Sequence, residues 1–364
     1  MGPGFASTVR ALVLLLQADS KTAADRNAGE ENRHACARKC DWGMGGDNTL
    51  CRSGWEDEEL AKPARACFTS AQEKNDMKLI DLTIPLGIGT PAWPTYEPLQ
   101  MKYFKRLAPN GANGQILTHS NHVGTHLDGE IHFYTPGKDI AALQLDYLVG
   151  DAAIVDLSDC CGNYDVYTSK MVEERVEVKK GDILIIHTGF HHYGWDQPTA
   201  DEISYMVKHP GPDREFAIWA KKKHLRWIGV DCGSADHPMN TIIRDWMPRQ
   251  AREADVHFRK NYGKPLAEFY SDDKYQLMHI EMFNHGIIHA ECLGGDIDLL
   301  LNQRAQVGCF PWRLVDGESC IARIVAFVDD ARYAKLMKIK AGCKLTKFGD
   351  IAGAKAPKLH GKRA

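Results

Sequence analysis

Short apolar runs recur through the middle and the end of the chain, and they predict the strands of a covered sheet. The runs are rich in Ile, Val and Leu and have the length of ordinary strands. They occupy residues 152–157, 182–187, 226–231 and 321–328.

Residues 213–224 show a different spacing, which predicts a helix. Asp213 stands where a helix N-cap is expected, and Phe216, Trp219 and Ala220 recur at helical spacing. We expect this apolar stripe to belong to the core and not to a cofactor site. Strands and helices together predict an α/β fold.

The apolar pattern begins abruptly at residue 77. The preceding segment is polar, charged and rich in Gly and Cys, so we expect residues 1–76 to be an N-terminal extension of uncertain order. The main domain is predicted over residues 77–343. Residues 344–364 carry basic side chains among small ones, and we expect a disordered tail there.

Composition narrows the classes of function. The chain has 364 residues, of which 44% are hydrophobic, which is enough for a large core. Its formal net charge of −3 gives no general attraction to nucleic acid or to an anionic membrane. No apolar stretch approaches the roughly 20 residues that span a bilayer, and the run near residue 14 is short for a signal peptide. We expect a cytoplasmic protein.

The cysteines favour buried free thiols over disulfides. Their number, 11, is odd, and several lie in or beside apolar stretches. The thiols expected to be free are those of Cys160, Cys161, Cys232, Cys292 and Cys309. The N-terminal cysteines lack the spacing of a zinc ribbon.

The strongest chemical signal lies between residues 122 and 132. His122, His126 and Asp128 offer two nitrogens and one oxygen, a ligand set that suits zinc, manganese or iron and leaves positions for water and substrate. His132 is left free to transfer protons. The alternative is a chance cluster of loop histidines, since the chain has 16, but the local density of ligand-type residues favours a metal site.

This segment, H-x-G-T-H-x-D-x-x-x-H, resembles the signature of the metal-dependent cyclase family, which includes bacterial kynurenine formamidase and isatin hydrolase. Thr125 is expected to orient a neighbouring ligand. Glu130 occupies a position where the family usually has proline, so we expect a different pocket shape or an added negative charge near the metal.

A second segment resembles the other site element of that family. His279, Gly286 and Glu291 fall on its positions, and the resemblance implies that His279 and Glu291 complete the coordination sphere or hold a second ion. Without the family, His279, His285 and His289 would be interpreted as helix-surface or capping residues.

Residues 81–94 and 229–238 also resemble parts of the family, so the resemblance spans about residues 77–330. In the second of these stretches, Ser234 and Asp236 are candidates for a proton relay or for contacts that orient the ligands. The resemblance implies a three-layer β/β/α fold of the swivelling-domain type, one or two zinc or manganese ions, a small-molecule substrate and a homodimer.

The implied reaction is hydrolysis of a formamide or cyclic amide, such as N-formylkynurenine or isatin. A metal-activated water attacks the carbonyl carbon, and His132 accepts its proton and returns it to the departing amine. Trp93, Phe133 and Tyr134 either flank an aromatic substrate or belong to the core. Two alternatives stay open: a lactone or cyclic-ester hydrolase or cyclase, and a catalytically silent metal-binding protein.

Overall fold

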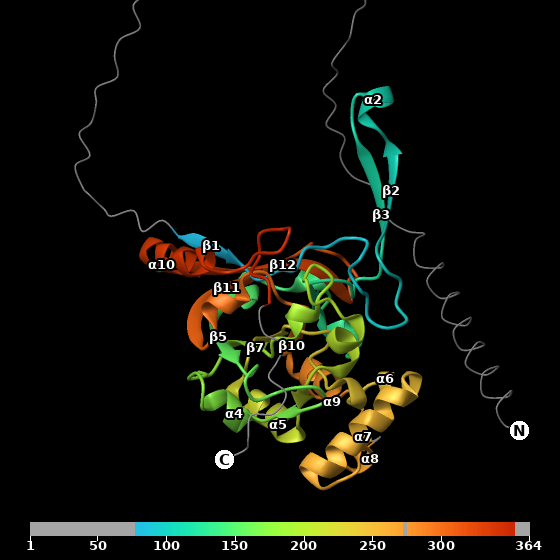
Figure 1. The fold of residues 1–364 in the computed structure, drawn as a ribbon, viewed down its shortest axis with the longest axis vertical. Helices are drawn as coiled ribbons and strands as arrows, with labels where there is room; N and C mark the ends of the chain where they lie inside the picture. The colour runs from blue at the N-terminus through green and yellow to red at the C-terminus, as the bar shows by residue number, and fades with distance from the viewer. Residues whose placement is uncertain (1–76, 272–274, 354–364) are drawn as a thin grey trace, which may run out of the picture. The chain divides into compact units, whose positions relative to one another are not determined.

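The computed structural model describes residues 77–271 and 275–353, and these form a mixed α/β domain (Figure 1). The expected N-terminal extension, with its four cysteines, and residues 354–364 lie outside the described residues.

One sheet of eight strands forms the centre of the domain, in the order β1-β12-β11-β5-β7-β9-β10-β4. Strand β4 pairs with both β10 and β12, so the sheet curls and closes on itself. The eight strands are β1 (Lys78–Asp81), β4 (His126–Asp128), β5 (Val149–Asp156), β7 (Ile183–His187), β9 (Trp227–Val230), β10 (Ile288–Glu291), β11 (Gln303–Pro311) and β12 (Ser319–Val328).

Two small pairs of strands lie outside this sheet. The pairs are β2 (Gln100–Lys105) with β3 (Gly114–Thr118), and β6 (Val166–Tyr167) with β8 (Gly211–Pro212). The β2–β3 hairpin projects from the rest of the domain (Figure 1), and every residue of β2 is exposed.

Helices cover the sheet and extend the domain at one side. The α-helices are α2 (Leu107–Asn110), α3 (Leu145–Leu148), α4 (Ser169–Glu173), α5 (Arg214–Lys223), α6 (Ile243–Trp246), α7 (Pro248–Tyr262), α8 (Leu266–Phe269), α9 (Leu277–Met282) and α10 (Asp330–Ala341). The shorter helical turns are η2 (Glu130–His132), η3 (Ile140–Ala142), η4 (Phe190–Tyr193), η5 (Ser204–Lys208), η6 (Pro238–Asn240), η8 (Phe283–His285) and η9 (Ile297–Leu300).

The predicted elements agree with the structure. The four apolar runs correspond to β5, β7, β9 and β12. The predicted helix is α5, where the Asp213 carboxylate accepts a hydrogen bond from the amide of Phe216 at 2.8 Å. Phe216, Trp219 and Ala220 are buried in the main core, as expected from their spacing.

The segment that follows α10 departs from the expectation of a disordered tail. Residues 344–353 fold back, with Leu345 and Ile351 forming a β-bridge. Ile351 is 7% exposed and Ala352 is 4% exposed. Two apolar residues within a basic stretch anchor it, because burying them offsets the cost of ordering the chain.

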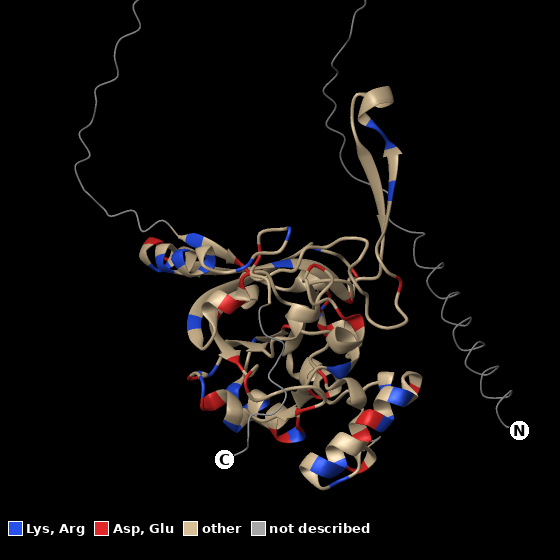
Figure 2. Cartoon of the chain, in the orientation of Figure 1, with Lys and Arg blue, Asp and Glu red and all other residues tan. Residues whose placement is uncertain are grey.

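Cysteines of the domain are free thiols, as predicted. Cys161, Cys232, Cys292 and Cys309 are buried, whereas Cys160 is exposed. Among the described residues, no helix is both long and apolar enough to cross a bilayer. Acidic and basic side chains are interspersed along α7 and α10 (Figure 2).

Candidate active site

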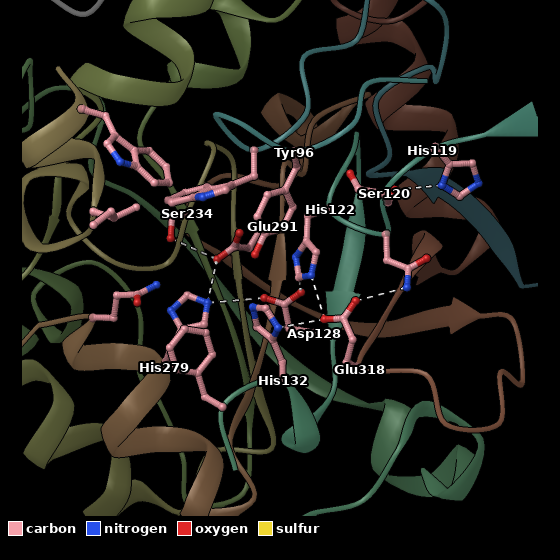
Figure 3. A pocket seen from close by; sticks show the side chains of 16 residues that line it. Tyr96, His119, Ser120, His122, Asp128, His132, Ser234, His279, Glu291 and Glu318 are labelled. Atoms are coloured by element: carbon pink, nitrogen blue, oxygen red, sulfur yellow. Dashed lines mark hydrogen bonds and ion pairs between the residues drawn. The ribbon is translucent and has the colours of Figure 1, made fainter. Parts of the chain in front are cut away.

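A cavity of about 680 Å³ brings together side chains that are far apart in the sequence (Figure 3). The predicted site residues that line it are His122, Asp128, His132, Ser234, His279 and Glu291. His126 does not line the cavity and is only 2% exposed, but its Nε2 atom lies 3.4 Å from Asp128 Oδ1.

The register of the sheet explains why these residues meet. Strand β4 contains His126 and Asp128, and its pairing with β10 places Glu291 opposite His126. On its other side, β4 pairs with β12 and places Ser319 opposite Asp128. Glu318 directly precedes Ser319 in the chain, and the side chain of Glu318 therefore reaches the same cavity.

His126 is held in one orientation by the backbone. Its Nδ1–H donates to the carbonyl of Gly124 at 2.8 Å, which leaves the Nε2 lone pair directed at Asp128 and Glu291. Gly124 has a φ of 66°, and a Cβ atom there would lie 3.0 Å from Leu86 Cδ1. The glycine of the motif therefore permits the turn that aims His126.

His279 is oriented by Asp236. The Nδ1–H of His279 donates to Asp236 Oδ2 at 2.6 Å, while its Nε2 atom lies 3.4 Å from Asp128 Oδ2 and 3.7 Å from Glu291 Oε1. Asp236 also accepts the backbone amides of Met278 and His279 at the start of α9. A carboxylate behind an imidazole in this way fixes its tautomer and raises its basicity as a ligand.

Glu318 connects two histidines of the cavity. Its Oε2 atom lies 2.8 Å from His122 Nε2 and 2.8 Å from His132 Nδ1 (Figure 3). His122 thereby turns its Nδ1 atom toward Asp128 Oδ1, at 3.1 Å. In His132 the same contact engages Nδ1.

The polar atoms at the centre lack hydrogen-bond partners. His126 Nε2 and both oxygens of Asp128 are buried and unpaired, although neighbouring nitrogens lie 3.1 to 3.4 Å from the Asp128 oxygens. Two atoms bound tetrahedrally to one zinc ion, each about 2.1 Å from it, lie about 3.4 Å apart. Buried polar groups are seldom left unpaired, so these residues fit a divalent cation.

Electrostatics in the cluster favour positive charge at its centre. Burial lowers the pKa of His279, but the carboxylates of Asp128 and Asp236 outweigh it and raise the pKa to about 10. His122 behaves in the same way, because Asp128 and Glu318 raise its pKa to about 10 against the effect of burial. A field that stabilises imidazolium also stabilises a bound cation.

In Glu291 and His126 the pKa shifts favour the neutral form of the side chain. Burial and the neighbouring Asp128 raise the pKa of Glu291 to about 8. Burial lowers the pKa of His126 to about 4, so its imidazole is neutral and suited to bind metal.

The remaining predicted residues lie close to the centre or outside it. Ser234 Oγ donates to Glu291 Oε1 at 3.3 Å. Thr125 Oγ1 donates to the carbonyl of Cys292 at 2.6 Å and accepts the amide of Ile84, so it ties backbone segments together instead of orienting a ligand. Glu130 does not line the cavity and accepts the amide of Lys138 at 2.9 Å.

Several side chains that line the cavity were absent from the predicted site. Glu318 belongs to no motif, and its only signal is the position just before a strand that pairs with β4. Aromatic side chains also line the cavity: Trp93 and Phe133, which the sequence suggested, and Tyr96 and Trp246, which it did not. Tyr134 is 38% exposed and does not line the cavity.

Comparison with known sequences identifies relatives of this chain. A family model described as "Putative cyclase" matches residues 80–237. Kynurenine formamidase of Bacillus cereus is 30% identical over 209 residues, which cover 57% of this chain and 78% of that protein. Kynurenine formamidase of Bacillus mycoides is 26% identical over 247 residues, which cover 68% of this chain and 95% of that protein.

Solved structures show the same fold. Isatin hydrolase A from Ralstonia solanacearum aligns with a TM-score of 0.55 at 16% identity, over 70% of this chain and 92% of that chain. Isatin hydrolase A from Labrenzia aggregata aligns with a TM-score of 0.54 at 16% identity, over 70% and 94% of the two chains. The fold is thus the cyclase-like α/β fold that the family resemblance implied, and the chain belongs to the cyclase family.

Proposed function

We propose that the chain is a metal-dependent hydrolase of a formamide or cyclic amide, with N-formylkynurenine and isatin as model substrates. The observation that carries the proposal is the buried, unpaired set of His126 Nε2 and both Asp128 oxygens, which faces further ligand-type atoms at the floor of an open cavity. The kynurenine formamidases among its relatives support N-formylkynurenine, and the isatin hydrolases of the same fold support isatin as the second model substrate.

In this proposal five side chains hold the metal: His122, His126, Asp128, His279 and Glu291. A divalent ion held by them would supply Lewis-acid chemistry, since it would lower the pKa of a water molecule toward about 7 and polarise a carbonyl group. The two oxygens of Asp128 face different partners, since Oδ1 lies near His122 and His126 and Oδ2 near His279. The mixed nitrogen and oxygen donors would suit one or two zinc or manganese ions.

His132 acts as the general base and acid. Because Glu318 accepts the Nδ1–H of His132, the Nε2 atom is the one available to take a proton from the attacking water. The same atom then returns the proton to the departing amine. Glu318 keeps the ring in position during both transfers, and its negative charge stabilises the imidazolium that forms between them.

The walls of the cavity favour an aromatic substrate. Trp93, Tyr96, Phe133 and Trp246 line it and offer flat apolar surfaces on which an aryl ring can pack. The polar floor then lies next to the amide group that such a ring carries. An aliphatic amide would leave much of this aromatic surface uncovered.

The proposal is tested by an activity panel on the purified full chain. N-formylkynurenine, isatin and simple lactones are assayed before chelation, after chelation and after Zn²⁺ or Mn²⁺ is restored. We expect amide hydrolysis that chelation abolishes and added metal restores. Lactone turnover alone would support the cyclic-ester alternative instead. Bound metal without turnover of any substrate would support a catalytically silent protein.

A variant separates catalysis from metal binding. His132→Ala is expected to lose amide hydrolysis while its metal content stays that of the wild type, because Nε2 of His132 is assigned to proton transfer. Unchanged turnover in this variant would contradict the role of His132.

We also propose that the chain is a homodimer. The β2–β3 hairpin supports this, because it exposes several large apolar side chains, among them Phe104 at 57% and Ile116 at 53%, and a gathering of exposed apolar side chains marks an interaction site. Light scattering is expected to give a dimer for the wild type and a monomer for Phe104→Asp/Ile116→Asp. Lys222→Glu, at an exposed position of α5 outside the hairpin, is the charge-change control. A monomeric wild type would refute the proposal.

A further inference from the structure

A second group of histidine and carboxylate side chains lies away from the cavity. We call it the second cluster, and its members are His187 at the end of β7, His191 and His192 in η4, and Asp298 in η9. None of these four lines the cavity of the candidate active site. Its three histidines are buried and its carboxylate is partly buried.

Ligand-type atoms of the second cluster converge on one point. Asp298 Oδ2 lies 3.1 Å from His191 Nε2, and Asp298 Oδ1 lies 3.1 Å from His192 Nε2 and 3.7 Å from His187 Nε2. The four ligand atoms all lie within 4.8 Å of one another. These separations bracket the distance of about 3.4 Å expected between two ligand atoms on one tetrahedral zinc ion.

Carboxylates outside the cluster orient two of its imidazoles. His187 Nδ1 lies 2.8 Å from Asp156 Oδ1, and His191 Nδ1 lies 3.0 Å from Asp231 Oδ2. Each contact uses the Nδ1–H as donor and turns Nε2 toward Asp298. Asp231 is fixed in turn by the amide and hydroxyl of Thr188, at 2.8 and 2.6 Å. Such support behind a ligand is typical of metal-binding histidines.

Hydrogen bonding alone does not complete the second cluster. His191 and His192 can each donate to a different oxygen of Asp298. His187 Nε2 then remains without a hydrogen-bond partner, and the residue is buried, with 2% of its surface exposed. A buried imidazole nitrogen without a partner is energetically unfavourable. A cation among the four side chains would engage this atom together with the other three.

We propose that the second cluster is a further metal site, which binds a zinc-like divalent cation with three histidine nitrogens and one carboxylate oxygen. Nitrogen-rich donors favour zinc over magnesium or calcium. Four protein ligands fill a tetrahedral sphere, so the site is structural and not catalytic. It ties the end of β7 to the η4 turn and to η9, which follows β10.

The test compares metal contents of full-length variants. His187→Asn/His191→Asn removes two Nε2 ligand atoms, while each asparagine amide can still donate to Asp156 or Asp231 as Nδ1–H did. His209→Asn is the matched control, because His209 is also fully buried and its Nδ1–H donates to the carbonyl of Pro210 at 2.9 Å. Each protein is stripped with a chelator, reloaded with Zn²⁺, desalted and analysed for zinc.

We expect the double variant to bind one zinc equivalent fewer per chain than the wild type and the His209→Asn control. A folded double variant with the zinc content of the wild type would overturn the proposal. An equal loss of zinc from the His209→Asn control would also overturn the proposal, since it would mark general disruption of the fold.

Crystals of the wild type provide a measurement that needs no variant. Anomalous difference density at the zinc edge is expected among the four side chains of the second cluster, separate from any density at the candidate active site. Density at the active site alone would overturn this inference and leave the proposed function intact. Density at the second cluster alone would support this inference and contradict the proposed function.

Discussion

Glu318→Gln removes one negative charge from the proposed site and changes no side-chain volume. In the wild type, Glu318 Oε2 accepts hydrogen bonds from His122 and His132, both at 2.8 Å. A glutamine oxygen can accept only at one end of the side chain, and its NH₂ group opposes any N–H that faces it. The variant therefore loses at least one of the two contacts or lets His132 rotate.

The size of the effect follows from the kind of bond that is lost. A hydrogen bond to a charged group contributes about 1.5–3 kcal/mol, and 1.36 kcal/mol corresponds to a tenfold change in rate. Because the carboxylate also stabilises the imidazolium formed on His132 during the reaction, the loss falls on the transition state. We expect kcat for N-formylkynurenine to fall about 10- to 100-fold, with a small change in KM.

The assay measures kcat, KM and metal content in the same preparations. Glu130→Gln is the matched control, since Glu130 lies in η2 beside His132 but accepts a backbone amide outside the cavity. The control is expected to retain wild-type kcat. If Glu318→Gln kept kcat within twofold of the wild type, the positioning role of Glu318 would be refuted. A fall in kcat explained by lost metal would assign Glu318 to metal binding instead.

Three further substitutions test a contact behind the site and two contacts elsewhere in the domain. Asp236→Asn is expected to weaken metal binding about 10- to 100-fold in equilibrium dialysis, because it disturbs the carboxylate behind His279; unchanged affinity would contradict this. For Asp165, burial raises the pKa, but the hydrogen bond from His257 and other donors outweigh it and lower the pKa below 3.8. The stability that Asp165→Asn loses in urea unfolding should therefore be present just above pH 3.8 and shrink as the pH falls below it; a loss that grows toward acid pH would refute this. Asp213→Ala is expected to lower the free energy of unfolding by about 1 kcal/mol through loss of the α5 cap. An unchanged free energy of unfolding would show that the cap does not stabilise the domain.

Most of the elements and site residues that the sequence predicted came from local patterns of residues. The runs that became β5, β7, β9 and β12 are apolar because the central sheet is covered, and Asp213 marks the start of α5 because its side chain caps the helix. His122, His126 and Asp128 lie close together in sequence, so their spacing alone brought them into one site. His279 and Glu291 were reached only through resemblance to a family.

Contacts that depend on tertiary register escaped prediction. Glu318 lies 196 residues from His122 and meets it because β12 pairs with β4. Asp298 lies 107 residues from His191, and the second cluster forms only once η4 and η9 pack together. For Thr125 the local motif was misleading. Its place in the motif suggested that it orients a ligand, but its hydroxyl donates to the backbone carbonyl of Cys292.

The central claim is that the side chains around Asp128 bind a divalent cation on which hydrolysis depends. The most direct test is the metal content of freshly isolated full-length protein beside that of Asp128→Asn, with turnover of N-formylkynurenine measured on the same samples. We predict that the variant loses at least one equivalent of metal per chain together with its turnover, while the ion of the second cluster stays bound. Full metal content and turnover in Asp128→Asn, or a metal-free wild type that hydrolyses the substrate, would contradict the account.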